Sequence, residues 1–431
     1  MLRRVRGEMD AADSPVPATN AVETHSAHSR RWRRALLFVT AGTLVAGGLA
    51  FTQKDRYTDN LAELSRSVIG NENTAKVERV YFRIQDRVDR TKYRLLGGKG
   101  RAFEEHVTVQ YVVREPGPVI VIDRRAKPAD ERPELLDFPA PPPPPLPVLE
   151  LPKVHRLREK PDPGEGEWTT AGLPRTTPER PLMAKTFVRP DPARPYAVAG
   201  ILLVDSHRTQ MKMVGGTKDP GGDRGVAGPG AIPDADHGNL LVAWNGGFQG
   251  PHGGFGMVAN GKEYRPLRTG LATVAVMEDG SLKMGEWGRT LTREPDMVAI
   301  RQNAALLVEN CEVSPRTTEG NDTWGYVQVD SSEFITWRSA IGLTRDGNLI
   351  VAAGNSLSAA TLAKALWAAG ACTAMQLDIN TPYVLTSLFF KEQDGTLRAE
   401  RFMASMPDSP GRFLRTQERD FMYLTYHAAA P

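Results

Sequence analysis

Residues 340–378 read AIGLTRDGNLIVAAGNSLSAATLAKALWAAGACTAMQLD, and this stretch decides the fold class. It opens with two apolar runs around Asp346-Gly347, a dipeptide typical of tight hairpin turns. A helix should follow, because Ser358 suits an N-cap and Gly370 favours termination. The final run, ACTAMQLD, is typical of a buried strand. Hairpin, helix and strand in this order predict a domain of mixed structure.

The chain on either side of this stretch is rich in strand-like runs separated by glycine-rich turns. YAVAGILLVD (196–205) and NLLVAWN (239–245) are apolar, and LATVAVMEDGSLKMG (271–285) predicts a second Asp-Gly hairpin. Many hairpins with few helices predict an α+β domain over residues 164–431, built on a mixed or antiparallel sheet.

Two smaller regions precede this domain. Residues 127–163 form a proline-rich linker whose PAPPPPPLP segment (139–147) favours a stiff polyproline II rod, either a spacer or a ligand for a partner's aromatic groove. Residues 52–126 predict a helix with apolar positions between 77 and 88, which ends at Gly97-Gly98. Two strands should follow it, HVTVQYVV (106–113) and PGPVIVID (116–123).

The N-terminal region predicts a single-pass membrane anchor. Residues 1–34 are polar and typical of a disordered tail; they end in RRWRR, and residues 35–51 are 17 uncharged residues. As a helix this run spans about 26 Å, near the short end of the bilayer range. The arginines favour a cytoplasmic N-terminus and an extracytoplasmic or periplasmic C-terminal domain. A cleaved signal peptide and a buried core helix remain the alternatives.

Charge and cysteine content narrow the function classes. The net charge of +3, from 54 basic and 51 acidic residues, does not call for a nucleic-acid partner. Cys311 and Cys372 are either a disulfide that export permits or two unpaired core residues, the interpretation we favour. Neither has neighbours at metal-ligand spacing, and we expect no metal or cofactor.

The first candidate site segment is AWNGGFQGPHGGFGM (243–257), at the end of a strand. Its glycines Gly246 and Gly247 allow close backbone approach to a ligand. Asn245 offers hydrogen bonds, and His252 exchanges a proton near neutral pH. The alternative is a structural glycine turn with a solvated histidine.

Two further segments carry polar residues at strand ends. Arg338 and Ser339 precede an apolar strand, and the Arg301-Gln302-Asn303 cluster ends another; such arginines either hold a phosphate or carboxylate or pair with a surface acid. Asp378 ends a buried strand, with Asn380 two residues on. It is either a general acid or base or a turn-forming residue.

Taken together, three motifs in this order resemble the phosphodiester glycosidase family. They are Asn-Gly-Gly-Phe after a strand, Arg-Ser-Ala-Ile-Gly opening a hairpin, and Leu-Asp ending the strand that follows a helix. The residues matching these motifs are Asn245, Gly246, Gly247 and Phe248, then Arg338, Ser339 and Gly342, and finally Asp378. The family usually continues its aspartate as Asp-Gly-Gly-Gly-Ser, whereas this chain continues as Ile-Asn-Thr-Pro, a form similar to a bacterial branch.

The resemblance implies a hydrolase that cleaves a sugar from a sugar-1-phosphodiester or a related cell-envelope glycan linkage. Asp378, His252 and Arg338 are then the expected catalytic residues. We expect substrate contacts from Asn245, Gly246, Gly247, Phe248, Arg301, Asn303, Ser339 and Asn380. The alternative is a non-catalytic module that binds envelope glycan or a partner protein. An enzyme requires the catalytic residues to converge on one site.

Overall fold

The computed structural model describes residues 57–97, 102–103, 109–111, 148–176, 181–325, 334–392, 394–406 and 409–427. Apart from Tyr57 and Thr58, these residues belong to a single compact unit, Asp59–Pro431. The predicted tail (1–34), the predicted anchor (35–51) and most of the proline-rich segment lie outside the described residues. Within those ranges, no helix combines the length and the hydropathy needed to cross a membrane.

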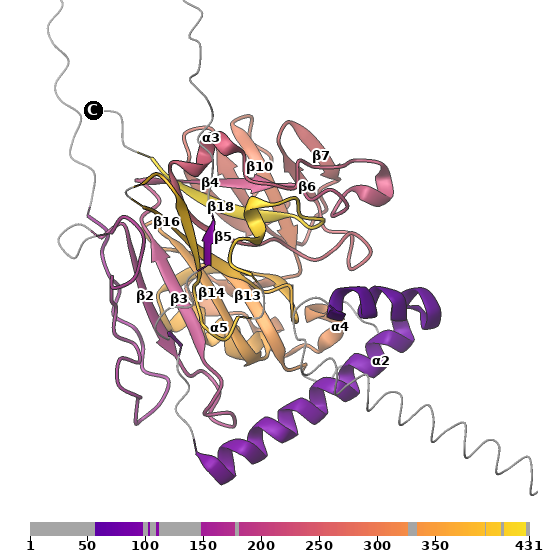
Figure 1. Cartoon of the computed structure of the whole chain (residues 1–431), viewed down its shortest axis with the longest axis vertical. Helices are drawn as coiled ribbons and strands as arrows, with labels where there is room; N and C mark the ends of the chain where they lie inside the picture. The colour runs from indigo at the N-terminus through magenta and orange to yellow at the C-terminus, as the bar shows by residue number, and fades with distance from the viewer. Residues whose placement is uncertain are drawn as a thin grey trace, which may run out of the picture. The chain divides into compact units, whose positions relative to one another are not determined.

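A seven-stranded sheet forms the centre of the fold (Figure 1), in the order β12-β11-β15-β13-β14-β3-β2. All of its neighbouring strands pair antiparallel. Its strands are β2 (Met183–Val188), β3 (Ala199–Val204), β11 (Leu306–Glu309), β12 (Glu312–Val313), β13 (Thr336–Thr344), β14 (Leu349–Leu357) and β15 (Ala371–Ile379).

A six-stranded antiparallel sheet packs against this first sheet, in the order β1-β17-β16-β5-β18-β4. Its strands are β1 (Val109–Tyr111), β4 (Thr209–Val214), β5 (Leu240–Asn245), β16 (Thr386–Lys391), β17 (Leu397–Arg401) and β18 (Phe421–Tyr426). Strand β1 lies within the predicted run 106–113, so the segment before the linker contributes a strand to the domain.

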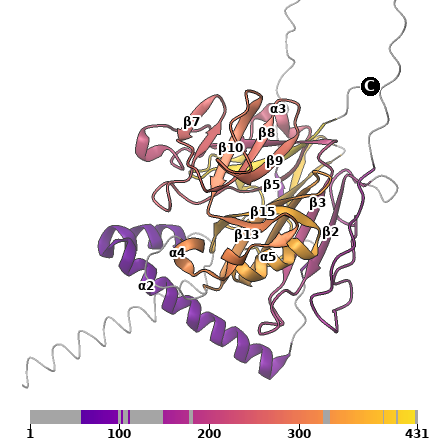
Figure 2. The same ribbon diagram turned by 180° about the vertical axis from the view of Figure 1, so that it is seen from behind.

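A five-stranded antiparallel sheet completes the β structure (Figure 2), in the order β7-β6-β10-β8-β9. Its strands are β6 (Met257–Ala259), β7 (Lys262–Arg265), β8 (Ala272–Met277), β9 (Leu282–Glu286) and β10 (Met297–Asn303). Both predicted Asp-Gly hairpins are present, as β8–β9 and β13–β14. Gly280 and Gly347 sit at their turns with φ of 86° and 79°.

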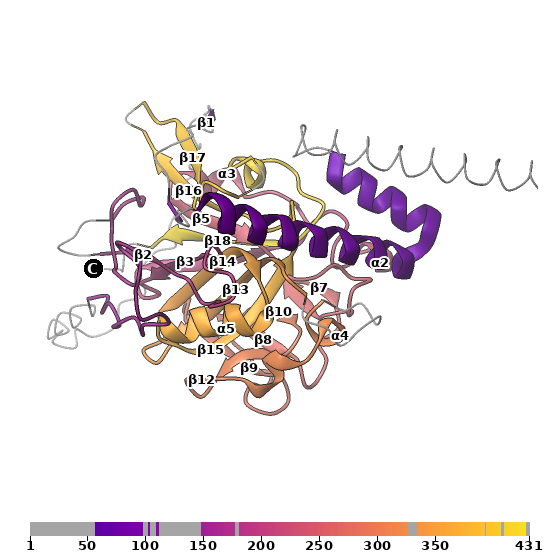
Figure 3. The same cartoon turned by 90° about the horizontal axis from the view of Figure 1, so that it is seen from below.

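Helix α5 (Ala359–Ala368) lies beside β13, β14 and β15 (Figure 3). Ser358 caps it in a capping box with Thr361, and Gly370 follows it with φ of 92°, as the sequence predicts. The other described helices are α2 (Tyr57–Leu96), α3 (Asp234–His237), α4 (Asn321–Trp324) and the 3-10 turns η1 (Gly222–Arg224), η2 (Pro315–Thr318) and η3 (Arg412–Leu414). Mostly antiparallel sheets with few helices agree with the predicted α+β class.

Strand alternation divides the core between two layers. In β3, Leu202 and Val204 join the cluster shared with the six-stranded sheet, whereas Ile201 and Leu203 join the cluster shared with α5. Both faces of the seven-stranded sheet are therefore buried, which explains why its strands read as continuous apolar runs.

The folded region begins earlier than the sequence predicts. Leu149 and Val154, assigned to the linker, are buried in the α5 core cluster. The His155 N–H donates to the Ala368 carbonyl at 2.8 Å, and the Trp168 indole donates to the Pro152 carbonyl at 2.7 Å. Residues 148–163 therefore pack on the domain, because their apolar side chains cover the end of α5.

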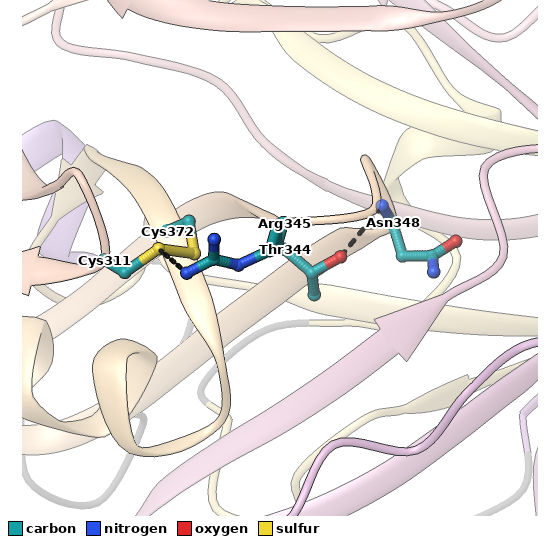
Figure 4. Close-up of a disulfide and its surroundings, with 5 residues drawn as sticks. All are labelled: Cys311, Thr344, Arg345, Asn348 and Cys372. Atoms are coloured by element: carbon teal, nitrogen blue, oxygen red, sulfur yellow. Dashed lines mark hydrogen bonds between the residues drawn. A yellow bond between two sulfur atoms is a disulfide. The ribbon is translucent and has the colours of Figure 1, made fainter.

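Cys311 and Cys372 form a disulfide (Figure 4), so the favoured expectation of unpaired core cysteines is wrong. Cys311 lies in the β11–β12 turn and Cys372 near the start of β15. The Cys311 N–H also donates to the Cys372 carbonyl at 2.9 Å, and Arg345 contacts the Cys311 sulfur at 3.5 Å. The bond ties an edge hairpin to β15, the strand that carries Asp378.

Candidate active site

The three sequence motifs meet where β5, β13 and β15 approach one another. The Asn245 amide donates to the Ser339 hydroxyl at 2.9 Å, and that hydroxyl donates to the Asp378 carbonyl at 2.8 Å. The Asp378 N–H in turn donates to the Gly246 carbonyl at 2.9 Å. One continuous hydrogen-bond chain thus links the first, second and third motifs.

A β-bulge in β15 sets the direction of Asp378. Arg338 lies opposite Ile379, but Ala340 lies opposite Gln376, so Ser339 has two residues across from it. Such a bulge re-aims side chains. It accounts for the position of Asp378 on the same side of the sheet as Ser339.

The Asp378 carboxyl group is almost fully buried and has two donors. Its Oδ2 accepts from Arg419 Nη1 at 2.7 Å, and its Oδ1 accepts from the Ile379 N–H at 2.9 Å. Burial raises the pKa of Asp378 to about 6, although the Arg419 charge and the Ile379 N–H oppose this rise. The group therefore exchanges a proton close to neutral pH, as a catalytic acid or base must.

A buried ion pair holds the backbone of the first motif, residues 245–248. Arg301 contacts Asp420 through two parallel hydrogen bonds, Nε–Oδ2 at 2.8 Å and Nη2–Oδ1 at 3.1 Å. Both side chains are almost inaccessible to solvent. Arg301 also donates to the Phe248 carbonyl at 2.9 Å, and Asp420 accepts from the Gly247 N–H at 3.2 Å. The pair therefore fixes the backbone that follows β5.

The two glycines of the first motif are required for this close approach. A Cβ on Gly246 would overlap the Asp420 carboxylate, and a Cβ on Gly247 would lie 2.7 Å from the Arg301 guanidinium carbon. Asn303 completes the support, because it accepts from the Phe248 N–H at 3.3 Å and donates to the Gln376 carbonyl at 2.7 Å.

Four backbone N–H groups of this loop have protein acceptors close to the first motif. Gly246 donates to the Asp420 carbonyl, Gly247 to the Asp420 carboxylate, Phe248 to Asn303 and Gly250 to Asp219. These four N–H groups are therefore engaged by the protein's own acceptors.

Residues 238–378 match the phosphodiester glycosidase family. The resemblance to this family is confirmed for that part of the chain. A comparison with curated proteins finds none that matches by sequence.

Three solved structures are similar to the chain. The zebrafish N-acetylglucosamine-1-phosphodiester alpha-N-acetylglucosaminidase catalytic domain, auto-inhibited by its pro-peptide, is 17% identical over 59% of this chain and 87% of that one, with a TM-score of 0.37. A Synechocystis protein is 11% identical over 57% and 62%, with a TM-score of 0.32. An exported protein from Burkholderia pseudomallei is 12% identical over 53% and 74%, with a TM-score of 0.24.

Arg338 of this phosphodiester glycosidase-like region lies away from the Asp378 carboxyl group. It is 1% exposed, and its guanidinium donates to the carbonyls of Leu357, Trp324 and Phe334 and to the Gln376 side chain. Arg338 and Ser339 are consecutive strand residues and therefore point to opposite faces of the sheet. The position of Arg338 beside α4 and the start of α5 is typical of a structural arginine.

Asn380, two residues after Asp378, has a left-handed backbone conformation. It has a φ of 74°, a region that asparagine tolerates better than most side chains. Its side chain accepts from the Thr336 hydroxyl at 2.8 Å, and its N–H donates to the Trp337 carbonyl at 2.9 Å. The other predicted catalytic residue, His252, lies in the turn after Gly250, and its side chain is partly exposed.

Arg419, Asp420, Tyr383 and Asp219 belong to the site but are missing from the sequence prediction. The Arg419 guanidinium lies 3.2 Å from the centre of the Tyr383 ring, and its side chain is 22% exposed. Burial raises the pKa of Asp219, although the Gly250 N–H and nearby arginines oppose the rise. Within the described ranges, no three His, Cys, Asp or Glu side chains are grouped to hold a metal ion.

The structure brings most predicted site residues into one network. Its members from the prediction are Asn245, Gly246, Gly247, Phe248, Arg301, Asn303, Ser339 and Asp378. Asp378 connects this buried network to the partly exposed side chain of Arg419. Asp378 and Arg419 are therefore the candidate reactive pair.

Proposed function

We propose that the domain is a hydrolase that cleaves the glycosidic bond of sugar phosphodiesters. The family match over residues 238–378 supports the reaction class. The observation that carries the proposal is the Asp378–Arg419 contact: a carboxyl group of raised pKa, 2.7 Å from a partly exposed cation.

Asp378 is the proposed general base. In its ionised form it accepts a proton from the water that attacks the anomeric carbon. The leaving phosphate group carries its negative charge without needing a proton. Arg419 is positioned to neutralise that charge through its guanidinium. The Arg301–Asp420 pair does no chemistry in this scheme and holds the backbone around Asp378 in place.

We further propose that the substrate is a cell-envelope glycan. Residues 35–51 support this setting, because an anchor there would restrict the domain to substrates near one membrane face.

The activity test uses the full chain with a panel of sugar-1-phosphodiesters, and free sugar is measured. Asp378→Asn should abolish release, because the amide cannot accept the proton. Asp346→Asn is the matched control, since Asp346 is exposed in the β13–β14 turn. A wild-type chain that releases no sugar from any diester would refute the proposal.

A non-catalytic glycan-binding role is the second candidate. The burial of Arg338 favours it, because the Arg338 guanidinium donates to buried acceptors such as the Trp324 carbonyl and is not exposed to a substrate. It predicts saturable binding to envelope polymer without turnover, measured by sedimentation of the chain with the polymer.

A further inference from the structure

Helix α2 carries an apolar stripe that no described residue covers. Val77, Tyr81, Ile84, Val88 and Leu95 recur at intervals of three, four and seven, which places them along one helix face. Their exposed fractions range from 57% to 77%. A stripe of large apolar residues with this exposure marks an interaction surface.

The opposite face of α2 is held by the domain. Asp86 accepts from the Arg194 guanidinium at 2.7 Å and from the Tyr196 hydroxyl at 3.1 Å. The Tyr93 and Tyr196 rings lie 5.7 Å apart. Phe82 also contacts Phe334, with ring centres 5.2 Å apart. Because these contacts fix the rotation of α2, the apolar stripe points away from the domain.

Basic side chains flank the stripe. Residues 76–96 contain seven lysines and arginines and three acidic residues, and one of those acids, Asp86, already pairs with Arg194. Arg87, Lys92 and Arg94 are exposed beside Val88 and Leu95. A helix with an apolar face and basic flanks is typical of binding to an anionic lipid surface.

The same charges disfavour a second copy of the helix as the occupant. In a parallel coiled coil, Arg87 of one copy would face Lys92 of the other, and antiparallel pairing would bring arginines together. In both arrangements, like charges would face each other across the interface between the two helices. Charge complementarity therefore favours phospholipid over self-association.

We propose that the α2 stripe lies flat on an anionic phospholipid surface, with Val77, Tyr81, Ile84, Val88 and Leu95 inserted among the headgroups. The chain length allows this placement. Residues 52–56 separate the predicted anchor from Tyr57 and reach at most about 18 Å when extended. From Tyr57 the helix bends at Gly70, which has a φ of 78°, before it reaches Val77. Through the Asp86–Arg194 contact, a docked α2 holds the domain beside the membrane surface.

The test places a fluorescent label on the stripe of the full chain in vesicles. Ile84→Cys and, as a matched control, Val298→Cys are labelled with an environment-sensitive dye. Both positions are exposed aliphatic residues, and the native cysteines are paired. In vesicles of equal parts phosphatidylcholine and phosphatidylglycerol, emission at position 84 should shift to the blue and be quenched by spin-labelled lipid. Position 298 should show neither effect.

A second variant tests the role of charge. Combining Arg87→Gln, Lys92→Gln and Arg94→Gln should abolish most of the blue shift, as should vesicles of phosphatidylcholine alone. No shift at position 84 in the anionic vesicles would overturn the proposal. So would a shift that persists undiminished in neutral vesicles, or energy transfer between labelled copies in place of quenching by lipid.

Discussion

At the scale of single residues, the pKa of Asp378 determines how activity depends on pH. Burial raises this pKa to about 6 from the ordinary value of 3.8. The proposed base is ionised above pH 6, so kcat/KM should be constant at pH 7–8 and fall about tenfold for each pH unit well below 6. A pH profile of sugar release measures this. Activity that instead falls above pH 6 would assign Asp378 the role of acid.

The same raised pKa has the opposite effect on stability. The folded state binds the Asp378 proton more tightly than the unfolded state does, so ionisation of this group weakens the fold above pH 6. That penalty is relieved as the pH falls from 6 towards 3.8. Between these values the contribution of Asp378 to stability therefore rises while catalysis declines.

A substitution at Gly247 tests how tightly the backbone of the first motif packs against Arg301. Gly247→Ala places a methyl group 2.7 Å from the Arg301 guanidinium carbon, and Arg301 is held by Asp420. We expect a loss of about 1–3 kcal/mol in the free energy of unfolding, the usual cost of overpacking, together with reduced sugar release. Chemical denaturation measures the first effect. Gly238→Ala is the control, because its Cβ meets nothing within 4 Å.

At the scale of elements, local patterns were sufficient to predict β3, β5, β15, the strands of the two Asp-Gly hairpins and helix α5. The Asp-Gly dipeptides predicted the β8–β9 and β13–β14 turns, and Ser358 with Gly370 predicted α5. These signals act within a few residues of the chain. The β15 bulge that aims Asp378 was not predictable, because it depends on the register between β13 and β15.

Long-range pairing accounts for the other missed residues. Arg419 and Asp420 reach the site because β18 pairs with β5, although well over a hundred residues separate these strands in the sequence. A charged Arg-Asp pair before the apolar run FMYLTY was the only local sign. Asp420 pairs with Arg301, and Arg419 pairs with Asp378, only once the chain has folded.

The disulfide should stabilise the β11–β15 contact. It closes a loop with a sequence separation of 61 residues, for which chain entropy predicts about 4 kcal/mol of stabilisation. Replacing both cysteines by serine should therefore lower the denaturation midpoint by a corresponding amount. Reducing agent should lower the midpoint of the wild type to the same level and leave the variant unchanged. Equal midpoints for all samples would contradict a stabilising bond.

At the scale of the whole molecule, the folded domain depends on residues before Gly164. Leu149 is 4% exposed and Val154 is 8% exposed, and burial of each such side chain contributes about 1.5–3 kcal/mol. The free energy of unfolding of a fragment of residues 164–431 should therefore be about 3 kcal/mol lower than that of residues 148–431. Chemical denaturation measures this difference. Residues 139–431 serve as the control and should match 148–431, because a polyproline II segment keeps its backbone solvated and buries no apolar surface. Equal stability of the 164–431 and 148–431 fragments would show that the packing of residues 148–163 is energetically neutral. If the predicted difference is found, the second part of the folded domain begins at Val148. Because β1 already pairs with β17, the proline-rich residues before Val148 then connect two parts of the same domain.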